Sequence, residues 1–225
     1  MIVIAVLLLA SVAPSSAAET PCITEADRRS FGNLCRYREE NGKLLQASSH
    51  PRVVMIGDSI TEGWIAADPT VFRDGVVHRG ISGETTGQML VRFRQDVIEL
   101  KPRAVHIMGG TNDIFGNVGT ASVDEVVSNI RSMGKLASGH GMRVIIGSVL
   151  PASRDGAPVT AVDELNRKLA ALAQSEGYEF VDYYRALDKG DGSMAAINSG
   201  DGVHPTEAGY ARMRPLAVKA IASVR

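Results

Sequence analysis

The sequence predicts an α/β protein built on a parallel sheet, because short strand-like runs alternate with longer helical patterns from Arg52 onward. The strand-like runs are Val53–Gly57, Val76–Gly80, Ala104–Gly110, Met142–Leu150 and Tyr178–Asp182. Runs such as VVMIG are apolar at every position, which is typical of strands that helices cover on both faces. A central parallel sheet of about five strands is therefore expected.

Helical patterns lie between the strand-like runs, and residues that stop helices follow them. The predicted helices are Thr85–Leu100, Ser122–Ala137, Val159–Ser175 and Thr206–Ser223. Pro102, Gly139 and Gly177 follow the first three. Pro215 lies inside the last helix, so we expect a kink or a break there. The segment Leu187–Gly202 is rich in Gly, Asp and Ser and is expected to form a long loop.

Composition restricts the class of protein. The chain has 225 residues, of which 44% are hydrophobic and 22% charged, and its formal net charge is -1. This profile is typical of a soluble globular protein of one main domain. A nucleic-acid partner is not expected, because such proteins usually carry a basic excess or stripe, and this chain has neither.

The first eighteen residues have the features of a signal peptide. An apolar run from Ile2 to Ala10 precedes the small residues of Ser15–Ala18, and the run is too short to cross a bilayer. We therefore expect residues 1–18 to be a signal peptide. The protein is then periplasmic or secreted, with no stable membrane insertion of the mature chain. We expect residues 19–50 to be an N-terminal extension packed on the main domain, residues 51–225.

The two cysteines, Cys22 and Cys35, both lie in this N-terminal extension. In an oxidising compartment they are expected to form a disulfide. The bond would close a loop of about a dozen residues and stabilise the fold by roughly 3 kcal/mol in the chain-entropy picture. Two free buried thiols are the alternative if the chain is not exported.

A serine and a histidine could form a catalytic pair. Ser59 follows the first predicted strand, at the edge of the sheet where α/β folds bind ligands. Asp201 and His204 are three residues apart, so the carboxylate can accept a hydrogen bond from Nδ1–H and leave Nε2 free to take a serine proton. Each feature alone also fits a helix cap or a loop ion pair.

Two further turns could stabilise an oxyanion. The second predicted strand runs into the segment Arg79–Thr85, where glycine lets the backbone approach a substrate and offer an N–H. Asn112 follows the third strand and can offer its side-chain amide at the same edge of the sheet. Taken singly, each segment is only a turn.

Four segments in this order, GDS, RGISGETT, GGTND and DGVHP, resemble the four blocks of the SGNH (GDSL) hydrolase family. The resemblance covers Val53 to about Leu216. It implies a flavodoxin-like three-layer α/β/α sandwich and a serine esterase without a metal or organic cofactor. It also implies that Ser59 is the nucleophile and His204 the base, oriented by Asp201. The implied oxyanion hole consists of the Ser59 and Gly83 N–H groups and Asn112. The G-x-S-x-G elbow of the α/β-hydrolases is absent, because residue 61 is threonine.

The expected substrate is a short-chain ester, either a small molecule or a carbohydrate that carries O-acetyl groups. Aromatic residues make up only 5% of the chain, and no long apolar insertion could cover a fatty chain. Three alternatives remain open: a lysophospholipase or thioesterase with the same catalytic residues, an acyl transferase that acts on sugar hydroxyls, and a noncatalytic carbohydrate-binding protein. The sequence predicts no particular oligomeric state.

Five other residues could be mistaken for parts of a site. His78 and His106 lie in strand patterns and are expected to be sheet residues rather than ligands. We expect Asp113 to shape its turn or to cap the next helix, and Arg79 to be a structural ion-pair partner. Trp64, the only tryptophan, either lines the acyl pocket or packs behind the serine turn.

Overall fold

The computed structural model describes residues 30–47, 50–119, 121–153 and 156–224. Its centre is a five-stranded sheet in the order β2-β1-β3-β4-β5, and every neighbouring pair of strands is parallel. The strands are β1 (Val53–Gly57), β2 (Val76–Gly80), β3 (Ala104–Met108), β4 (Arg143–Gly147) and β5 (Glu179–Val181). This is the flavodoxin-like strand order, and it confirms the predicted fold class.

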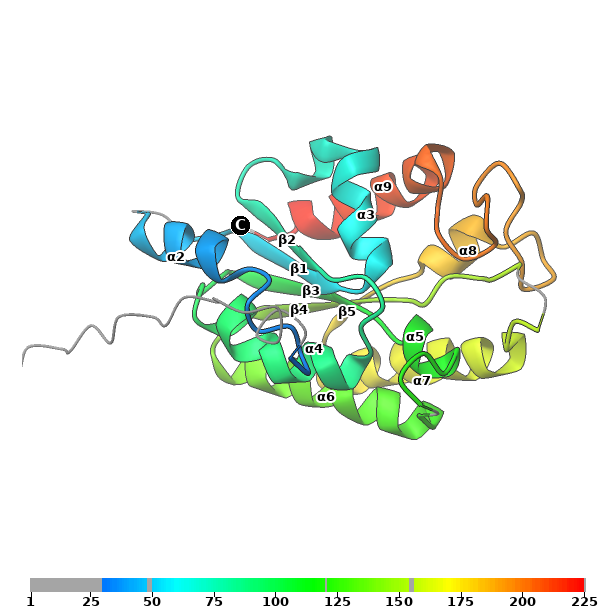
Figure 1. The fold of residues 1–225 in the computed structure, drawn as a ribbon, viewed down its shortest axis with the longest axis horizontal. Helices are drawn as coiled ribbons and strands as arrows, with labels where there is room; N and C mark the ends of the chain where they lie inside the picture. The colour runs from blue at the N-terminus through cyan, green and yellow to red at the C-terminus, as the bar shows by residue number, and fades with distance from the viewer. Residues whose placement is uncertain (1–29, 48–49, 120, 154–155, 225) are drawn as a thin grey trace, which may run out of the picture.

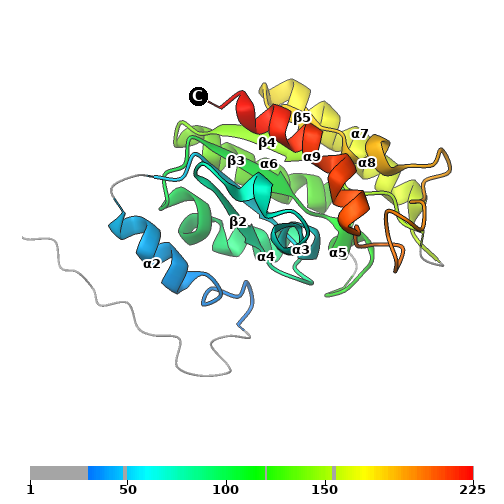
Figure 2. The ribbon, with the colours of Figure 1, turned by 90° about the horizontal axis from the view of Figure 1, so that it is seen from above.

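Helices cover both faces of the sheet and complete a three-layer sandwich (Figures 1 and 2). One layer consists of α4 (Thr86–Phe93), α6 (Val123–Gly139) and α7 (Val159–Glu176). The other contains α3 (Ser59–Ala67), α8 (Tyr183–Leu187) and α9 (Glu207–Ala222). Shorter elements are the 3-10 helix η1 (Pro69–Phe72) and the helix α5 (Thr111–Ile114).

The alternation of side chains along β1 produces two hydrophobic cores. Val54 and Ile56 belong to the core under α4, α6 and α7. Val53 and Met55 point to the opposite face and belong to the core under α3 and α9. Because successive side chains of a strand alternate between faces, a strand covered on both sides must be apolar throughout. This accounts for the uninterrupted apolar run in the sequence.

The predicted helix at Thr85–Leu100 contains a change of winding. The α-helix α4 ends at Phe93 and continues as the π-helix η2 (Arg94–Ile98), in which the N–H of Glu99 donates to the carbonyl of Arg94 at 2.9 Å. An i→i+5 bond of this kind marks a π-type turn. The wider winding carries Asp96, whose side chain is fully buried.

The last helix runs through Pro215 as one element, so of the two expected outcomes, a kink or a break, the break does not occur. Proline removes one backbone hydrogen bond, but Met213 and Ala217 on either side of it are both fully buried in the core. Packing of both halves against the sheet outweighs the lost bond. As predicted, no helix or strand lies between Leu187 and Glu207.

The described part of the N-terminal extension contains the helix α2 (Arg38–Gln46). Its Asn41 side chain is buried and donates to Asp96 Oδ1 at 2.6 Å, which anchors the helix to η2. The predicted signal peptide and Cys22 lie outside the described residues, so the Cys22–Cys35 disulfide stays a prediction. Within the described ranges, no helix is both long enough and apolar enough to cross a membrane.

Candidate active site

Ser59 lies at the start of α3, two residues beyond the end of β1. Asp58 caps this helix by accepting a hydrogen bond from the N–H of Ile60 at 2.9 Å. The connection is so tight that a Cβ on Gly57 would lie 2.1 Å from Thr61 Oγ1, so only glycine fits there. The first N–H groups of a helix have no intrahelical partner, and the helix dipole favours a negative charge beside them.

Ser59, His204 and Asp201 form a hydrogen-bonded chain. Ser59 Oγ lies 2.9 Å from His204 Nε2, and His204 Nδ1 lies 2.6 Å from Asp201 Oδ2. The other carboxylate oxygen of Asp201 accepts hydrogen bonds from the backbone N–H groups of Val203 and His204 at 2.9 and 2.8 Å. The three-residue spacing therefore folds the carboxylate back onto its own turn and fixes the orientation of the imidazole.

The carboxyl group of Asp201 has a lowered pKa. Its partial burial opposes ionisation, but the hydrogen bonds from the His204 side chain and from two backbone N–H groups outweigh that effect. Asp201 is consequently a carboxylate at neutral pH. A carboxylate at Nδ1 favours the tautomer in which Nε2 can accept a proton.

Near the site, a hydrogen bond also connects α3 with α9, two helices that lie far apart in the sequence. The hydroxyl of Tyr210, in α9, donates to the carbonyl of Ile60, in α3, at 2.8 Å. Both helices belong to the same layer of the sandwich, and the tyrosine is buried. This contact fixes the helix that follows His204 against the helix that begins at Ser59.

Asn112, in α5, is buried beside these residues, and both ends of its amide are engaged. Its Nδ2 donates to the backbone carbonyl of Glu84 at 2.8 Å, and its Oδ1 accepts a hydrogen bond from Asn117. An amide nitrogen carries two hydrogens, so one remains that can be directed at a ligand. Glu84 belongs to the segment Ile81–Thr85, which we name the β2–α4 loop.

Gly83 lies in the β2–α4 loop and has a φ of 80°. This left-handed conformation strains any residue with a Cβ, although no atom lies within 4 Å of the place that a Cβ would take. Glycine is therefore required at this position by the backbone conformation and not by a shortage of space.

A cavity of about 150 Å³ brings most of the predicted site residues together, but Gly83 is not among the residues that line it. The lining residues are Ser59, Thr111, Asn112, Phe115, Asn117, Asp201, Val203 and His204. Thr111 and Val203 belong to segments that the sequence singled out. The sequence analysis did not identify Phe115 and Asn117. The helix α5 ends after one turn, and the chain then folds back so that Asn117 N donates to the carbonyl of Asn112 at 3.0 Å. Nothing in the sequence indicates this turn.

Asp113 and Arg79 differ from their predicted roles. Asp113 does cap a helix, but it caps α4 and not the next helix: it accepts from Thr86 N at 2.9 Å and Thr86 Oγ1 at 2.6 Å. Arg79 forms no ion pair within the described residues. Its Nε and Nη2 donate to Asn41 Oδ1 at 2.9 and 2.7 Å, and its guanidinium lies 4.7 Å from the centre of the Tyr37 ring. Its Nη1 also donates to the carbonyl of His78 at 2.7 Å, so its partners are an amide, a backbone carbonyl and an aromatic face.

The two strand histidines lie against aromatic side chains. His106 is fully buried, with Nε2 3.0 Å from the hydroxyl of Tyr183, and burial lowers its pKa to about 4. The ring of His78 lies 5.8 Å from that of Tyr37 and 5.6 Å from that of Phe72.

In the part of the chain that the structure describes, no three His, Cys, Asp or Glu residues are grouped to hold a metal ion.

Trp64 belongs to the core behind the serine helix. Its side chain is fully buried, and its ring lies 5.8 Å from that of Tyr183 and 5.4 Å from that of Tyr210. It does not line the cavity at Ser59. Of its two proposed roles, packing is therefore the one that the structure supports.

Comparison with known proteins agrees with this geometry. The family model of the GDSL-like lipases and acylhydrolases matches residues 55–212. The chain belongs to this family. Esterase TesA of Pseudomonas aeruginosa is 27% identical to the hydrolase over 184 residues, which cover 76% of this chain and 87% of TesA. The match of the family model to residues 55–212, a range that contains all four sequence segments, confirms the resemblance to the SGNH (GDSL) hydrolases.

Solved structures share the fold of the GDSL-family hydrolase. A GDSL-like lipase from Bacteroides thetaiotaomicron is 39% identical, with a TM-score of 0.81, and the match covers 87% of this chain and 100% of that one. The acetylxylan esterase Axe2 from Geobacillus stearothermophilus is 24% identical, with a TM-score of 0.66, and the match covers 78% of this chain and 95% of that one. The match to the family model and the similarity to these family members identify the protein as a carboxylic ester hydrolase.

Proposed function

We propose that this hydrolase is a serine esterase that cleaves short-chain esters through an acyl-enzyme on Ser59. The observation that carries the proposal is the chain of contacts from Ser59 Oγ to His204 Nε2 at 2.9 Å and from His204 Nδ1 to Asp201 Oδ2 at 2.6 Å. A serine hydroxyl is a weak nucleophile until an adjacent base removes its proton, and this arrangement supplies such a base.

The reaction has two symmetrical halves. Ser59 Oγ forms a bond to the ester carbonyl carbon while its proton moves to His204 Nε2. The bond to the alcohol oxygen then breaks, and the alcohol leaves with that proton. Water attacks the acyl-enzyme in the same way, and the acid is released from Ser59. Asp201 stays ionised throughout and stabilises the imidazolium that forms in each half.

The negative charge on the carbonyl oxygen requires donors that are already oriented. We assign this role to the backbone N–H groups of Ser59 and Gly83 and to the Asn112 amide. Ser59 is the first residue of α3, Asn112 lines the same cavity as Ser59, and Asn112 is bonded to the loop that contains Gly83. Donors held in this manner cost no reorganisation in the transition state.

The size and lining of the cavity favour a small acyl group. Its volume is about 150 Å³, whereas pockets for drug-sized ligands usually measure about 300–1,000 Å³. Phe115 and Val203 are its apolar lining residues, while Thr111 and Asn117 add polar groups. Acetyl groups on a carbohydrate, or simple acetyl to butyryl esters, match a site that offers two apolar contacts and several hydrogen-bonding groups.

A chain-length series tests the substrate class. We expect kcat/KM on nitrophenyl esters to be highest from acetyl to butyryl and lower for every acyl chain of about twelve carbons or more, because the cavity cannot bury them. Acetylated sugars are assayed beside them, with Ser59→Ala as the blank. A maximum at long chains would assign the protein to the lysophospholipases. Preference for thioesters over oxygen esters of the same acyl group would make it a thioesterase.

We also propose that the enzyme acts outside the cytoplasm. The support is the N-terminal pattern of an apolar run followed by small residues, and the occurrence of both cysteines in the segment that follows it, residues 19–50. N-terminal sequencing of the protein recovered from the producing cells tests this. A mature chain that begins near residue 19, with Cys22 and Cys35 resistant to alkylation, is the expected result. An intact N-terminus with two alkylated cysteines would contradict it.

A further inference from the structure

The segment before the first strand contacts Glu84, which follows Gly83 in the β2–α4 loop, as well as Gly80 at the end of β2 and Glu62 in α3, the residue that binds Ser82. We propose that Asn33, Arg36 and Tyr37 are positioning residues that hold this loop in the conformation in which the Gly83 N–H binds the oxyanion. The inference rests on the proposed function, in which Gly83 is an oxyanion donor. It gives the N-terminal extension a part in catalysis.

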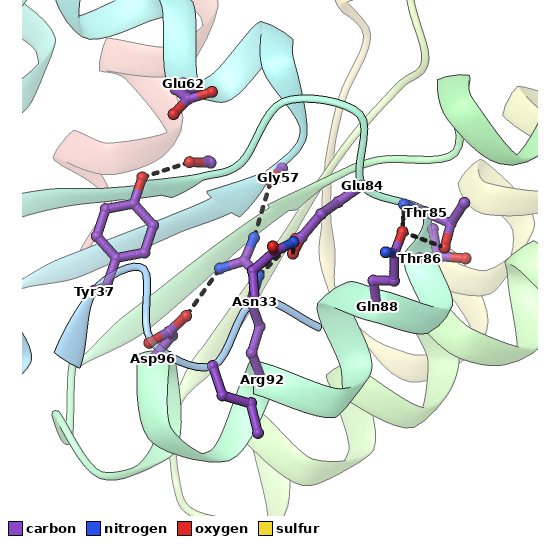
Figure 3. A network of polar contacts seen from close by, with 12 residues as sticks. Asn33, Tyr37, Gly57, Glu62, Glu84, Thr85, Thr86, Gln88, Arg92 and Asp96 are labelled. Carbon is purple, nitrogen blue, oxygen red and sulfur yellow. Dashed lines mark hydrogen bonds and ion pairs between the residues drawn. The ribbon is translucent and has the colours of Figure 1, made fainter. Parts of the chain in front are cut away.

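The first contact reaches the residue after Gly83. Asn33 Nδ2 donates to Glu84 Oε1 at 2.8 Å, and Arg92 Nε donates to Glu84 Oε2 at 2.6 Å. The Glu84 and Arg92 side chains are both buried, and Figure 3 shows Asn33 and Arg92 converging on the carboxylate. Glu84 therefore has each carboxylate oxygen held by a different element, one of them in the N-terminal extension.

The second contact acts through Glu62 on Ser82, the residue before Gly83. Arg36 Nη2 lies 3.2 Å from Glu62 Oε1, and the other oxygen of Glu62 accepts hydrogen bonds from Ser82 N at 2.8 Å and Ser82 Oγ at 2.5 Å. Glu62 belongs to α3, the helix that begins at Ser59. Arg36 thus helps to fix the carboxylate that holds the backbone of Ser82 against the serine helix.

The third contact lies at the end of β2, directly before the loop. The hydroxyl of Tyr37 donates to the backbone carbonyl of Gly80, the last residue of β2. Tyr37 is only 2% exposed, and the guanidinium groups of Arg36 and Arg79 each lie 4.7 Å from the centre of its ring. In Figure 3 a dashed line marks this hydrogen bond from the Tyr37 hydroxyl.

Gly83 needs this support because packing does not provide it. Apart from the flanking residues Ser82 and Glu84, no residue has an atom within 4 Å of the place of a Cβ on Gly83, so no side chain from elsewhere packs against that side of it. The hydrogen bonds of Ser82 and Glu84 are what restrain the peptide groups on either side. The carbonyl of Glu84 also accepts from Asn112 Nδ2 at 2.8 Å, so the same loop orients a second proposed oxyanion donor.

Two substitutions test the proposal with little change elsewhere. Tyr37→Phe removes the hydroxyl and keeps the ring that both guanidinium groups contact. Asn33→Gly removes the side-chain amide, and glycine readily adopts the positive φ of 47° that the backbone has at this position. Oxyanion donors act mainly in the transition state, so we expect kcat on an acetyl ester to fall roughly 5- to 30-fold in each variant, with KM changed less than about twofold.

Two controls separate positioning from general destabilisation. Lys43→Ala removes an exposed ion pair with Glu39 in the same N-terminal segment and should keep wild-type kcat. Ile130→Val loosens the core at a buried position in α6, away from the loop, and shows how much kcat falls when only the melting temperature falls.

The proposal is overturned if either Tyr37→Phe or Asn33→Gly keeps wild-type kcat while folded by thermal melt. A change confined to KM, or a loss of kcat no larger than in Ile130→Val at a matched fall in melting temperature, also overturns it. Ser59→Ala distinguishes this failure from a failure of the proposed function. If Ser59→Ala is inactive, the serine mechanism stands even when the positioning role does not.

Discussion

The side-chain nitrogen of Asn112 lies 2.8 Å from the backbone carbonyl oxygen of Glu84. This hydrogen bond connects α5, which follows β3, to the loop that follows β2. It occupies one hydrogen of the amide and thereby fixes the direction of the other. Because Asn117 donates to the amide oxygen, the orientation of the group is set at both ends.

Replacing Asn112 tests whether that remaining hydrogen acts on developing charge. We expect Asn112→Ala to lower kcat by about 10² to 10³, or roughly 3 to 4 kcal/mol, with little change in KM. Asn112→Asp should be at least as damaging, because its carboxylate cannot donate and faces both the Glu84 carbonyl and the oxyanion. Both variants should remain folded and be labelled slowly at Ser59 by a fluorophosphonate. Wild-type kcat in Asn112→Asp would make the residue a turn former.

Replacing the proposed nucleophile gives the most direct test of the mechanism. Ser59→Ala should lower kcat by roughly four to six orders of magnitude without unfolding the protein, and His204→Ala in that background should cost little more, because the residues act as one unit. Steady-state kinetics and thermal melts of the single and double variants check this. Additive losses would show that Ser59 and His204 do not act together.

The carboxyl group of Asp58 predicts a dependence of stability on pH. Burial raises its pKa to about 6 from an ordinary value of 3.8, against the opposing hydrogen bond from Ile60 N–H. The folded protein binds this proton more tightly than the unfolded chain. The stability that Asp58 contributes is therefore fully present below about pH 4 and is lost as the pH rises through about 6, by about 3 kcal/mol in all.

Asp58→Asn isolates this effect, since its side-chain oxygen can still accept from Ile60 N–H. Urea unfolding of both proteins between pH 4 and pH 7 gives the difference in unfolding free energy. We expect that difference to shift in favour of Asp58→Asn as the pH rises. A difference that stays constant across this range would show that the Asp58 pKa is not raised in the folded state.

Arg92 is predicted to be essential to the fold because it is paired with two buried carboxylates. It lies 2.6 Å from Glu84 and 3.0 Å from Asp96, and all three side chains are excluded from solvent. Arg92→Met should destabilise the protein by about 3 to 5 kcal/mol, because it leaves buried charges unpaired. Adding Glu84→Gln and Asp96→Asn should recover much of that loss in urea unfolding. If the triple variant is no more stable than Arg92→Met, charge burial is not the cause.

The sequence was sufficient for much of the fold because the strands carry a strong local signal. The bounds of β1 and β2 agree with the prediction at both ends, since each run is flanked by residues that end a strand. β3 is shorter than predicted because Gly109 and Gly110 form the turn into α5, where Gly110 has a φ of 120°. An apolar run cannot show where backbone pairing stops.

The buried polar contacts could not be predicted, because their partners lie far apart in the chain. Arg92 and Asp96 are four residues apart and look like an exposed helical ion pair in the sequence, yet neither is exposed. Asn33 meets Glu84 across 51 residues, and Asp113 meets Thr86 across 27. Single-sequence patterns report periodicity and turns, and they contain no signal for contacts between polar residues at such separations.

The sequence separation between Ser59 and His204 also determines when the catalytic pair can form during synthesis of the chain. The two residues are separated by 145 positions, and α9 joins the serine helix through Tyr210 and Ile60. At translation rates of about 5 to 20 residues per second, the serine is synthesised roughly 7 to 30 s before the histidine. Under the proposed mechanism, a nascent chain carries Ser59 without its base, and the hydroxyl stays inactive toward esters until the C-terminal segment has folded.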